Sequence, residues 1–444
     1  MNHEPMGSSP HGDRPEGADA RFGRRTPEYT GRYVIQLDQR RPERGMKALR
    51  SAVDTMPFER VRGTQAERAP ELLDRPDVSV LFDELGIAVV DVPPDRRHAL
   101  VTAAEAEPTI VSAEPERKVY ASVITEDRQS LTGFFPTYRS DEEEVDRSIR
   151  ARGAAVLGPA WDELRMTWGI QAIKANLSML TGRGVKIAVL DTGVDTDHPD
   201  LADRIKATAS FVPGETVEDS HGHGTHCIGT AAGPLEPEDA PRYGVAVEAD
   251  MLCGKVLNHR GEGTDGQIVA GLAWAIAKGA RVISLSLGSP VGPGELFPQT
   301  YENIARLALQ RGTLIVAAAG NESDRPTFVS PVTRPANCPS ILAVGALGKD
   351  LVVAPFSCAG LNGRGGELNI AAPGVDILSA APDGTHQMLS GTSMATPHVA
   401  GVVALLAQAD PNASAETLRG RLLADAHPLP QDAVDIGEGL LQAP

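Results

Sequence analysis

Two segments of the sequence carry residue types that suit proton transfer during nucleophilic catalysis. Asp191 follows the apolar run of residues 186–190. It therefore lies where a buried strand emerges at its carboxyl end, a usual place for active-site residues in parallel sheets. His223 stands in the glycine-rich run DSHGHGTH of residues 219–226, which allows close packing where a loop enters a helix. An imidazole there can take a proton from a serine on one ring nitrogen while an aspartate fixes the other.

Two further segments supply a nucleophile and an oxyanion donor. Ser393 lies in SGTSMATPHVAG, residues 390–401, ahead of an apolar stretch typical of a buried helix. A residue in the first turn of a helix has an unpaired backbone N–H close to the positive end of the helix dipole, so Ser393 can be both nucleophile and oxyanion donor. Asn321, in AAAGNE, closes a buried strand and delivers an amide to the same edge of the sheet.

Each motif alone also has a simpler explanation. Asp191 is typical of a turn, and Ser393 of a helix N-cap. The histidines at 221, 223 and 226 suggest a metal site, but no cysteine or carboxylate cluster with the usual ligand spacing accompanies them. The combination of all four motifs favours catalysis.

The elements that position these residues indicate an α/β fold. Apolar runs without strict alternation occur at residues 185–190, 251–257, 282–287, 314–319 and 341–346. Such runs, separated by helical stretches, indicate strands buried on both faces. We therefore predict a doubly wound, mostly parallel sheet flanked by helices over residues 161–444.

A small α+β domain is predicted ahead of this sheet, over residues 30–121. Its predicted elements are strands at 31–37, 84–92, 109–112 and 118–120 and a helix over 95–107. Residues 1–29 are predicted to be a disordered tail, because they are rich in Gly, Pro, Arg and Asp without apolar periodicity. Residues 122–160 contain the acidic run 141–144 and are predicted to be a solvated linker, exposed to cleavage.

Composition narrows the classes of partner. With 444 residues, 41% of them hydrophobic and 23% charged, the chain is expected to form two soluble folded units. A net charge of −17 argues against binding to nucleic acid or to an anionic membrane surface. The longest apolar runs fall short of the roughly 20 residues that cross a bilayer, so no transmembrane helix is expected.

The compartment and the redox state are also expectations from the sequence. The first 25 residues lack the apolar core of a secretory signal, which favours a cytoplasmic location. Cys227 lies in a segment that is predicted to form a helix, and Cys253 in one that is predicted to form a strand. We expect them to be reduced thiols, together with Cys338 and Cys358.

Together the segments IAVLDTGVDTDHPDL, GHGTHCIGTAAG, AAAGNES and SGTSMATPHVAGVVALL resemble the subtilisin-like serine peptidases, in the family's order of Asp, His and Ser. The resemblance implies a serine endopeptidase that works through an acyl-enzyme and needs no cofactor for its chemistry. Asp191 would be the orienting carboxylate, His223 the general base and acid, Ser393 the nucleophile and Asn321 the oxyanion donor. His226 would be a buried structural histidine.

The resemblance also implies how substrates bind. Two strand edges would pair with an extended protein or peptide, and they comprise Gly261, Glu262 and Gly263 on one side and Ser286, Leu287 and Gly288 on the other. Main-chain pairing recognises an extended backbone more than particular side chains. We therefore expect the enzyme to accept many different substrate sequences. The segment 322–335 departs from familiar members, and no side-chain preference follows from it.

The N-terminal domain resembles the inhibitory propeptide of many family members. The resemblance implies that this domain is an intramolecular inhibitor whose last strand occupies the substrate cleft. Its removal, by a cut between about Tyr120 and Trp168, would activate the enzyme.

A structural calcium is a further implication. Asp200 matches a carboxylate that serves a stabilising calcium in many relatives. The partner loop of residues 233–244, however, contains three prolines and lacks the expected asparagine, so calcium binding stays open.

Three functional hypotheses remain at this point: a general endopeptidase, a processing protease dedicated to one partner, and a catalytically silent binding scaffold. Degradation of a panel of unrelated proteins would favour the first, and intact self-processing without such degradation the second. The third predicts that a fluorophosphonate probe does not label Ser393.

Overall fold

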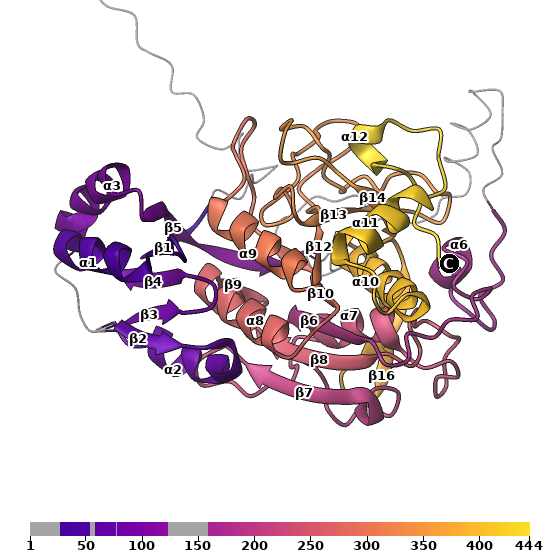
Figure 1. The fold of residues 1–444 in the computed structure, drawn as a ribbon. Coiled ribbons are helices and arrows are strands. Elements are labelled where there is room, and N and C mark those ends of the chain that lie inside the picture. The colour runs from indigo at the N-terminus through magenta and orange to yellow at the C-terminus, as the bar shows by residue number, and fades with distance from the viewer. Residues whose placement is uncertain (1–26, 54–57, 77, 123–158) are drawn as a thin grey trace, which may run out of the picture. The chain divides into compact units, whose positions relative to one another are not determined.

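The computed structural model describes residues 27–53, 58–76, 78–122 and 159–444. Most of the predicted tail and most of the predicted linker lie outside these residues, and Tyr29, the last residue of the predicted tail, begins a strand. Within the described ranges, no helix combines the length and the apolar character needed to cross a membrane. The fold consists of a parallel sheet with flanking helices, preceded by a mixed α+β sheet domain (Figure 1).

The parallel sheet has seven strands in the order β14-β13-β12-β10-β6-β8-β7, and every pairing in it is parallel. The strands are β6 (Lys186–Asp191), β7 (Ile205–Ser210), β8 (Asp250–Lys255), β10 (Val282–Leu285), β12 (Leu314–Ala318), β13 (Leu342–Leu347) and β14 (Ile370–Pro373). The predicted doubly wound sheet is confirmed.

Helices cover both faces of this sheet. They are α6 (Trp168–Ala172), α7 (His223–Ala232), α8 (Asp265–Ala277), α9 (Gln299–Gln310), α10 (Thr392–Ala409), α11 (Ala415–Ala424) and α12 (Ala433–Ile436). Ile187 and Val189 of β6 share a buried cluster with α7 and α10, whereas Ala188 and Leu190 share one with α8 and α9. Successive side chains of a strand point to opposite faces, so the run 187–190 is apolar throughout because both faces are covered.

Sequence patterns missed the two edge strands. β7 alternates between partly buried and exposed positions, and its sequence IKATAS has no apolar run. β14 has only four residues. β7 is only partly buried and β14 is short, so neither gives the long apolar run that marks a central strand.

The N-terminal sheet is built from β1 (Tyr29–Leu37), β2 (Phe58–Val61), β3 (Ser79–Phe82), β4 (Ile87–Asp91) and β5 (Ile110–Ala121). Helices α1 (Pro42–Val53), α2 (Ala69–Leu73) and α3 (Arg97–Ala106) accompany it. Met46 and Leu49 of α1 and Leu100 of α3 belong to the domain's own buried cluster.

Several details of this domain differ from the prediction, which also missed β2, β3 and α2. Residues 109–112 and 118–120 were expected as separate strands, but β5 is one strand of 12 residues. Pro115 lies inside it, opposite Tyr33, because proline removes one N–H without preventing an extended backbone. Helix α1 was not expected, although the spacing of Met46, Leu49 and Val53 is typical of an amphipathic helix.

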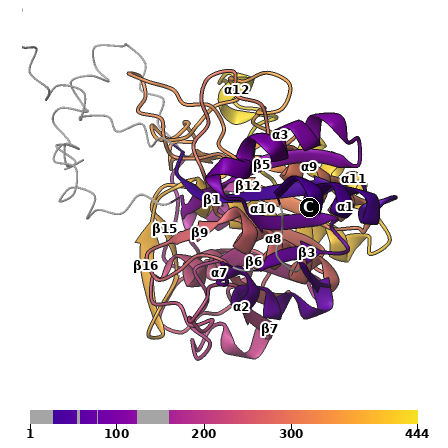
Figure 2. The ribbon, with the colours of Figure 1, turned by 90° about the vertical axis from the view of Figure 1, so that its left-hand side faces the viewer.

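Four shorter strands complete the described strands. They are β9 (Glu262–Thr264), β11 (Leu287–Gly288) and the hairpin of β15 (Ile377–Ala381) with β16 (Thr385–Leu389). Figure 2 shows this hairpin at the left-hand side of the view. Both β9 and β11 pair with β5 of the N-terminal domain.

Candidate active site

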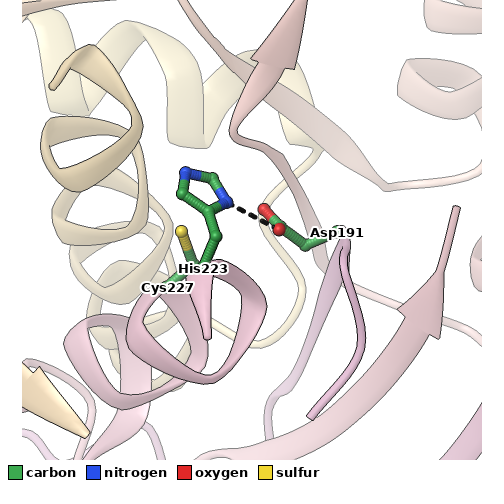
Figure 3. Close-up of side chains that lie close together, drawn as sticks. All are labelled: Asp191, His223 and Cys227. Carbon is green, nitrogen blue, oxygen red and sulfur yellow. Dashed lines mark hydrogen bonds and ion pairs between the residues drawn. The ribbon is translucent and has the colours of Figure 1, made fainter. Parts of the chain in front are cut away.

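The predicted base and its orienting acid meet where β6 ends and α7 begins. The Nδ1 atom of His223 lies 2.7 Å from Oδ1 of Asp191 (Figure 3). The N–H of Thr192 donates to the same oxygen at 2.7 Å, and the side chains of Asp191 and His223 are both buried. An Nδ1–H that donates to the carboxylate leaves Nε2 as the proton acceptor. Nε2 of His223 has no hydrogen-bond partner among the described residues.

The loop before α7 is held by Asp219, which sequence reasoning did not select. Its Oδ1 accepts from the Thr192 hydroxyl at 2.8 Å and from the N–H groups of His221 and Gly222 at 3.1 and 2.9 Å. Its Oδ2 accepts from the N–H and the hydroxyl of Thr225, each at 2.8 Å. Burial alone would raise the pKa of Asp219, but these donors lower it. An aspartate just ahead of a helix start was the signal available in the sequence.

The predicted nucleophile lies at the start of α10. Ser393 is fully buried, and its hydroxyl donates to the carbonyl of Ser286 at 3.0 Å. The Ser286 hydroxyl donates in turn to the carbonyl of Ser393 at 2.8 Å. The hydrogen bond between Ser393 and His223 that a triad requires is therefore not made here. Such bonds often tighten only in the reacting complex.

The amide of Asn321 follows β12 and is oriented by the start of α10. Its Oδ1 accepts from the N–H and from the hydroxyl of Thr392, each at 2.9 Å. These two donors identify that atom as the oxygen, so Nδ2 is the atom of the amide that donates hydrogen bonds. Nδ2 donates to the carbonyl of Ser122 at 2.6 Å. Thr392 was not selected from the sequence, although it stands next to Ser393.

The two predicted substrate-binding edges lie on either side of β5. The register places Val119 opposite Gly263, Tyr120 opposite both Glu262 and Gly288, and Ala121 opposite Leu287. Beyond the strand pairs, the Ala121 N–H donates to the carbonyl of Gly261 at 2.9 Å. The Ser122 N–H donates to the carbonyl of Ser286 at 3.2 Å. An extended segment of the chain thus lies paired on both sides and ends beside Asn321.

The alternative of a three-histidine metal site is not supported. Among the described residues, the one group of potential ligand atoms that lie within 4.8 Å of one another belongs to Asp191, His223 and Cys227 (Figure 3). His226 instead donates from Nε2 to the carbonyl of Ile377 at 2.8 Å, and burial lowers its pKa to about 3. Burial also raises the pKa of the Cys227 thiol, which keeps it protonated and a poor metal ligand.

Comparison with known proteins gives consistent matches. A family model described as Subtilase family matches residues 182–440. Subtilisin BL from Lederbergia lenta is 42% identical over 280 residues, which are 62% of this chain and 96% of that protein. M-protease from Shouchella clausii (strain KSM-K16) is 43% identical over 259 residues, 57% of this chain and 63% of that protein. Subtilisin E from Bacillus subtilis (strain 168) is 41% identical over 260 residues, 57% of this chain and 64% of that protein.

Proposed function

Since this chain belongs to the subtilase family and is a subtilisin-like serine endopeptidase, we propose that it cleaves itself after Ser122 and is inhibited by its own N-terminal domain. One observation carries the proposal. The carbonyl oxygen of Ser122 accepts a hydrogen bond from Nδ2 of Asn321 at 2.6 Å, while the Ser122 N–H donates to Ser286. A carbonyl held by the oxyanion donor is the group that the nucleophile attacks.

The proposed reaction follows from the positions of these groups. Ser393 Oγ attacks the carbonyl carbon of Ser122 while His223 takes the hydroxyl proton, and Asn321 donates to the oxygen that becomes negative. His223 then gives the proton to the leaving amine of residue 123 as the C–N bond breaks. Water hydrolyses the resulting ester, with His223 again acting as base, and leaves Ser122 with a free carboxylate.

Contacts that do not involve the cleaved bond support inhibition by the product. An oxygen of Glu116 accepts from the N–H of Gly266 at 3.0 Å, at the start of α8. An oxygen of Glu114 accepts from the N–H of Gln299 at 2.7 Å, at the start of α9. Carboxylates are stabilised at helix N-termini by unpaired N–H groups and by the helix dipole. These bonds and the pairing of β5 remain after cleavage, so the product is expected to stay in the cleft.

A peptidase acts on proteins or peptides. The prediction of which of them this enzyme accepts depends on the two strand edges that pair with β5. Main-chain pairing along both sides of β5 favours acceptance of many extended segments. A processing protease dedicated to one partner remains the alternative. Incubation with a panel of unrelated proteins separates the two hypotheses, because only a general endopeptidase would degrade them. A cytoplasmic location stays a prediction, and cell fractionation tests it.

Intact mass measurement of the purified wild type beside Ser393→Ala tests self-cleavage. We expect the wild type to yield one fragment that ends at Ser122 and one that begins at residue 123. Removing the nucleophile of a subtilisin lowers turnover by roughly six orders of magnitude, so Ser393→Ala should remain full length. Ser390→Ala, three residues away, is a matched control and should be cut like the wild type. A cut at another bond, or an uncut wild type, would contradict the proposal.

A further inference from the structure

We propose that Asp200 is not a calcium ligand in this chain but the centre of a metal-free clamp. Its partners are His198, Tyr243 and His386. The clamp joins the turn that contains Asp200 to the loop of residues 233–244 and to the β15–β16 hairpin. The proposal does not depend on self-cleavage, because it concerns stability.

Protein donors occupy both carboxylate oxygens of Asp200. Oδ2 accepts from the Tyr243 hydroxyl at 2.5 Å and lies 2.9 Å from Nε2 of His386. Oδ1 accepts from the N–H of Glu238 at 2.9 Å. Burial would raise the pKa of Asp200, but these three donors lower it. The carboxylate is thus ionised and satisfied by the protein.

His198 and the aromatic rings fix the orientation of this group. Nδ1 of His198 accepts from the N–H of Asp200 at 3.1 Å, and its Nε2 donates to the carbonyl of Thr385 at 3.0 Å. The His386 ring packs edge to face against Tyr243 at 5.3 Å and against His198 at 5.6 Å between centroids. Bonds and ring contacts together connect three segments that are distant in the sequence.

The donor set does not fit calcium. Calcium takes about six to eight oxygen ligands, whereas Asp200 faces an imidazole N–H and a phenol O–H. The main-chain carbonyl of Asp200 is also occupied, because Nη2 of Arg204 donates to it at 2.9 Å. Among the described residues, no carboxylate, histidine or cysteine joins Asp200 in a group of three potential ligands. The positive guanidinium of Arg204 beside Asp200 also disfavours a divalent cation there.

The clamp bears on the active site through the hairpin. β15 contacts α7, the helix that begins at His223: the Ser379 hydroxyl donates to the carbonyl of His226 at 2.9 Å, and His226 donates to Ile377. Holding β16 through His386 therefore also restrains β15 against α7. In this chain a hydrogen-bonded network supplies the cross-link that a calcium ion would otherwise supply.

Thermal unfolding of the full-length chain, in a Ser393→Ala background that prevents self-digestion, tests the clamp. We expect the same Tm in excess CaCl2 and in excess EDTA. Tyr243→Phe removes only the hydroxyl that donates to Asp200 and should lower the Tm by about 2–4 °C in both conditions. Tyr33→Phe, in the N-terminal sheet, is the matched control and should leave the Tm near that of the parent.

Asp200→Asn separates the remaining outcomes. If calcium raises the Tm of the parent and Asp200→Asn abolishes that rise, Asp200 is a calcium ligand and the proposal is overturned. A rise that persists in Asp200→Asn comes from another site and supports the proposal. A Tm for Tyr243→Phe equal to that of the parent would also overturn the clamp, and this variant keeps the test decisive if Asp200→Asn fails to fold.

Discussion

The side-chain amide of Asn321 lies 2.6 Å from the main-chain carbonyl of Ser122, although the two residues are 199 positions apart in the sequence. The amide is oriented from behind by Thr392, and the carbonyl is presented by β5. The donor and the carbonyl are therefore positioned by different elements. Substitutions that alter the amide of Asn321 can therefore be tested separately from substitutions in β5.

Replacing the amide should slow both self-cleavage and the hydrolysis of other substrates. For Asn321→Ala we expect kcat to fall by about 10²–10³, the effect of removing the corresponding donor in a subtilisin, from which the size is taken. KM should change little, because the donor acts mainly on the developing charge. Steady-state kinetics with a chromogenic peptide measure both. An unchanged kcat would remove Asn321 from the oxyanion site.

Thr392 should act through Asn321 rather than on the substrate. Thr392→Val keeps the shape but removes the hydroxyl that donates to Asn321. Losing one such bond costs roughly 0.5–1.5 kcal/mol, so we expect kcat to fall by about 2- to 10-fold. In an Asn321→Ala background the same substitution should have no further effect on kcat. Thr417→Val, on the exposed start of α11, is the control, and additive effects in the double variant would contradict this role.

The carboxylate of Glu116 should contribute to inhibition by the cleaved N-terminal domain. Glu116→Gln weakens its interaction with the N–H of Gly266 at the start of α8, and it also removes the ion pair with Arg32 of β1. A charge at a helix N-terminus contributes about 1 kcal/mol, so inhibition should weaken by roughly five-fold. The lag between self-cleavage and the appearance of activity should shorten. Glu105→Gln, exposed on α3, should keep the lag of the wild type. Equal lags in all three proteins would argue against this contact.

Asp219 should make the stability of the site dependent on pH. Its pKa is lowered in the folded state, so its contribution is fully present above its ordinary pKa of 3.8 and is lost as the pH falls through the folded value. Asp219→Asn should lower the free energy of unfolding by about 2 kcal/mol at neutral pH. The difference from the parent should narrow below about pH 4. Urea unfolding across pH, with Ser393→Ala as parent, measures this, and a difference independent of pH would contradict it.

The cysteines should be unreactive in the native protein. Cys227, Cys253, Cys338 and Cys358 are buried free thiols, and burial raises their pKa values, that of Cys253 to about 12. The thiolate is the form of cysteine that attacks alkylating reagents, so native protein should gain no mass with iodoacetamide. The unfolded protein should gain four carbamidomethyl groups. Fewer groups without reductant would reveal a disulfide.

Several features of this chain are local enough to be read from the sequence. The apolar runs of the central strands, the place of Asp191 at the end of one run and the place of Ser393 ahead of a buried helix all follow from patterns a few residues long. The parallel sheet was predicted for this reason. The edge strands and the continuity of β5 were not predicted. β7 is weakly buried and β14 is short, and Pro115 obscures the local pattern of β5.

The sequence by itself determined the residue types of the site, their order and the sheet that carries them, because strand ends and helix starts are encoded by neighbouring residues. Only the tertiary structure decided which distant groups meet. Ser122 reaches Asn321 because β5 pairs with both β9 and β11, and Asp200 meets Tyr243 and His386 because a loop and a hairpin converge on it. Such contacts depend on packing between elements, and local periodicity carries no information about them.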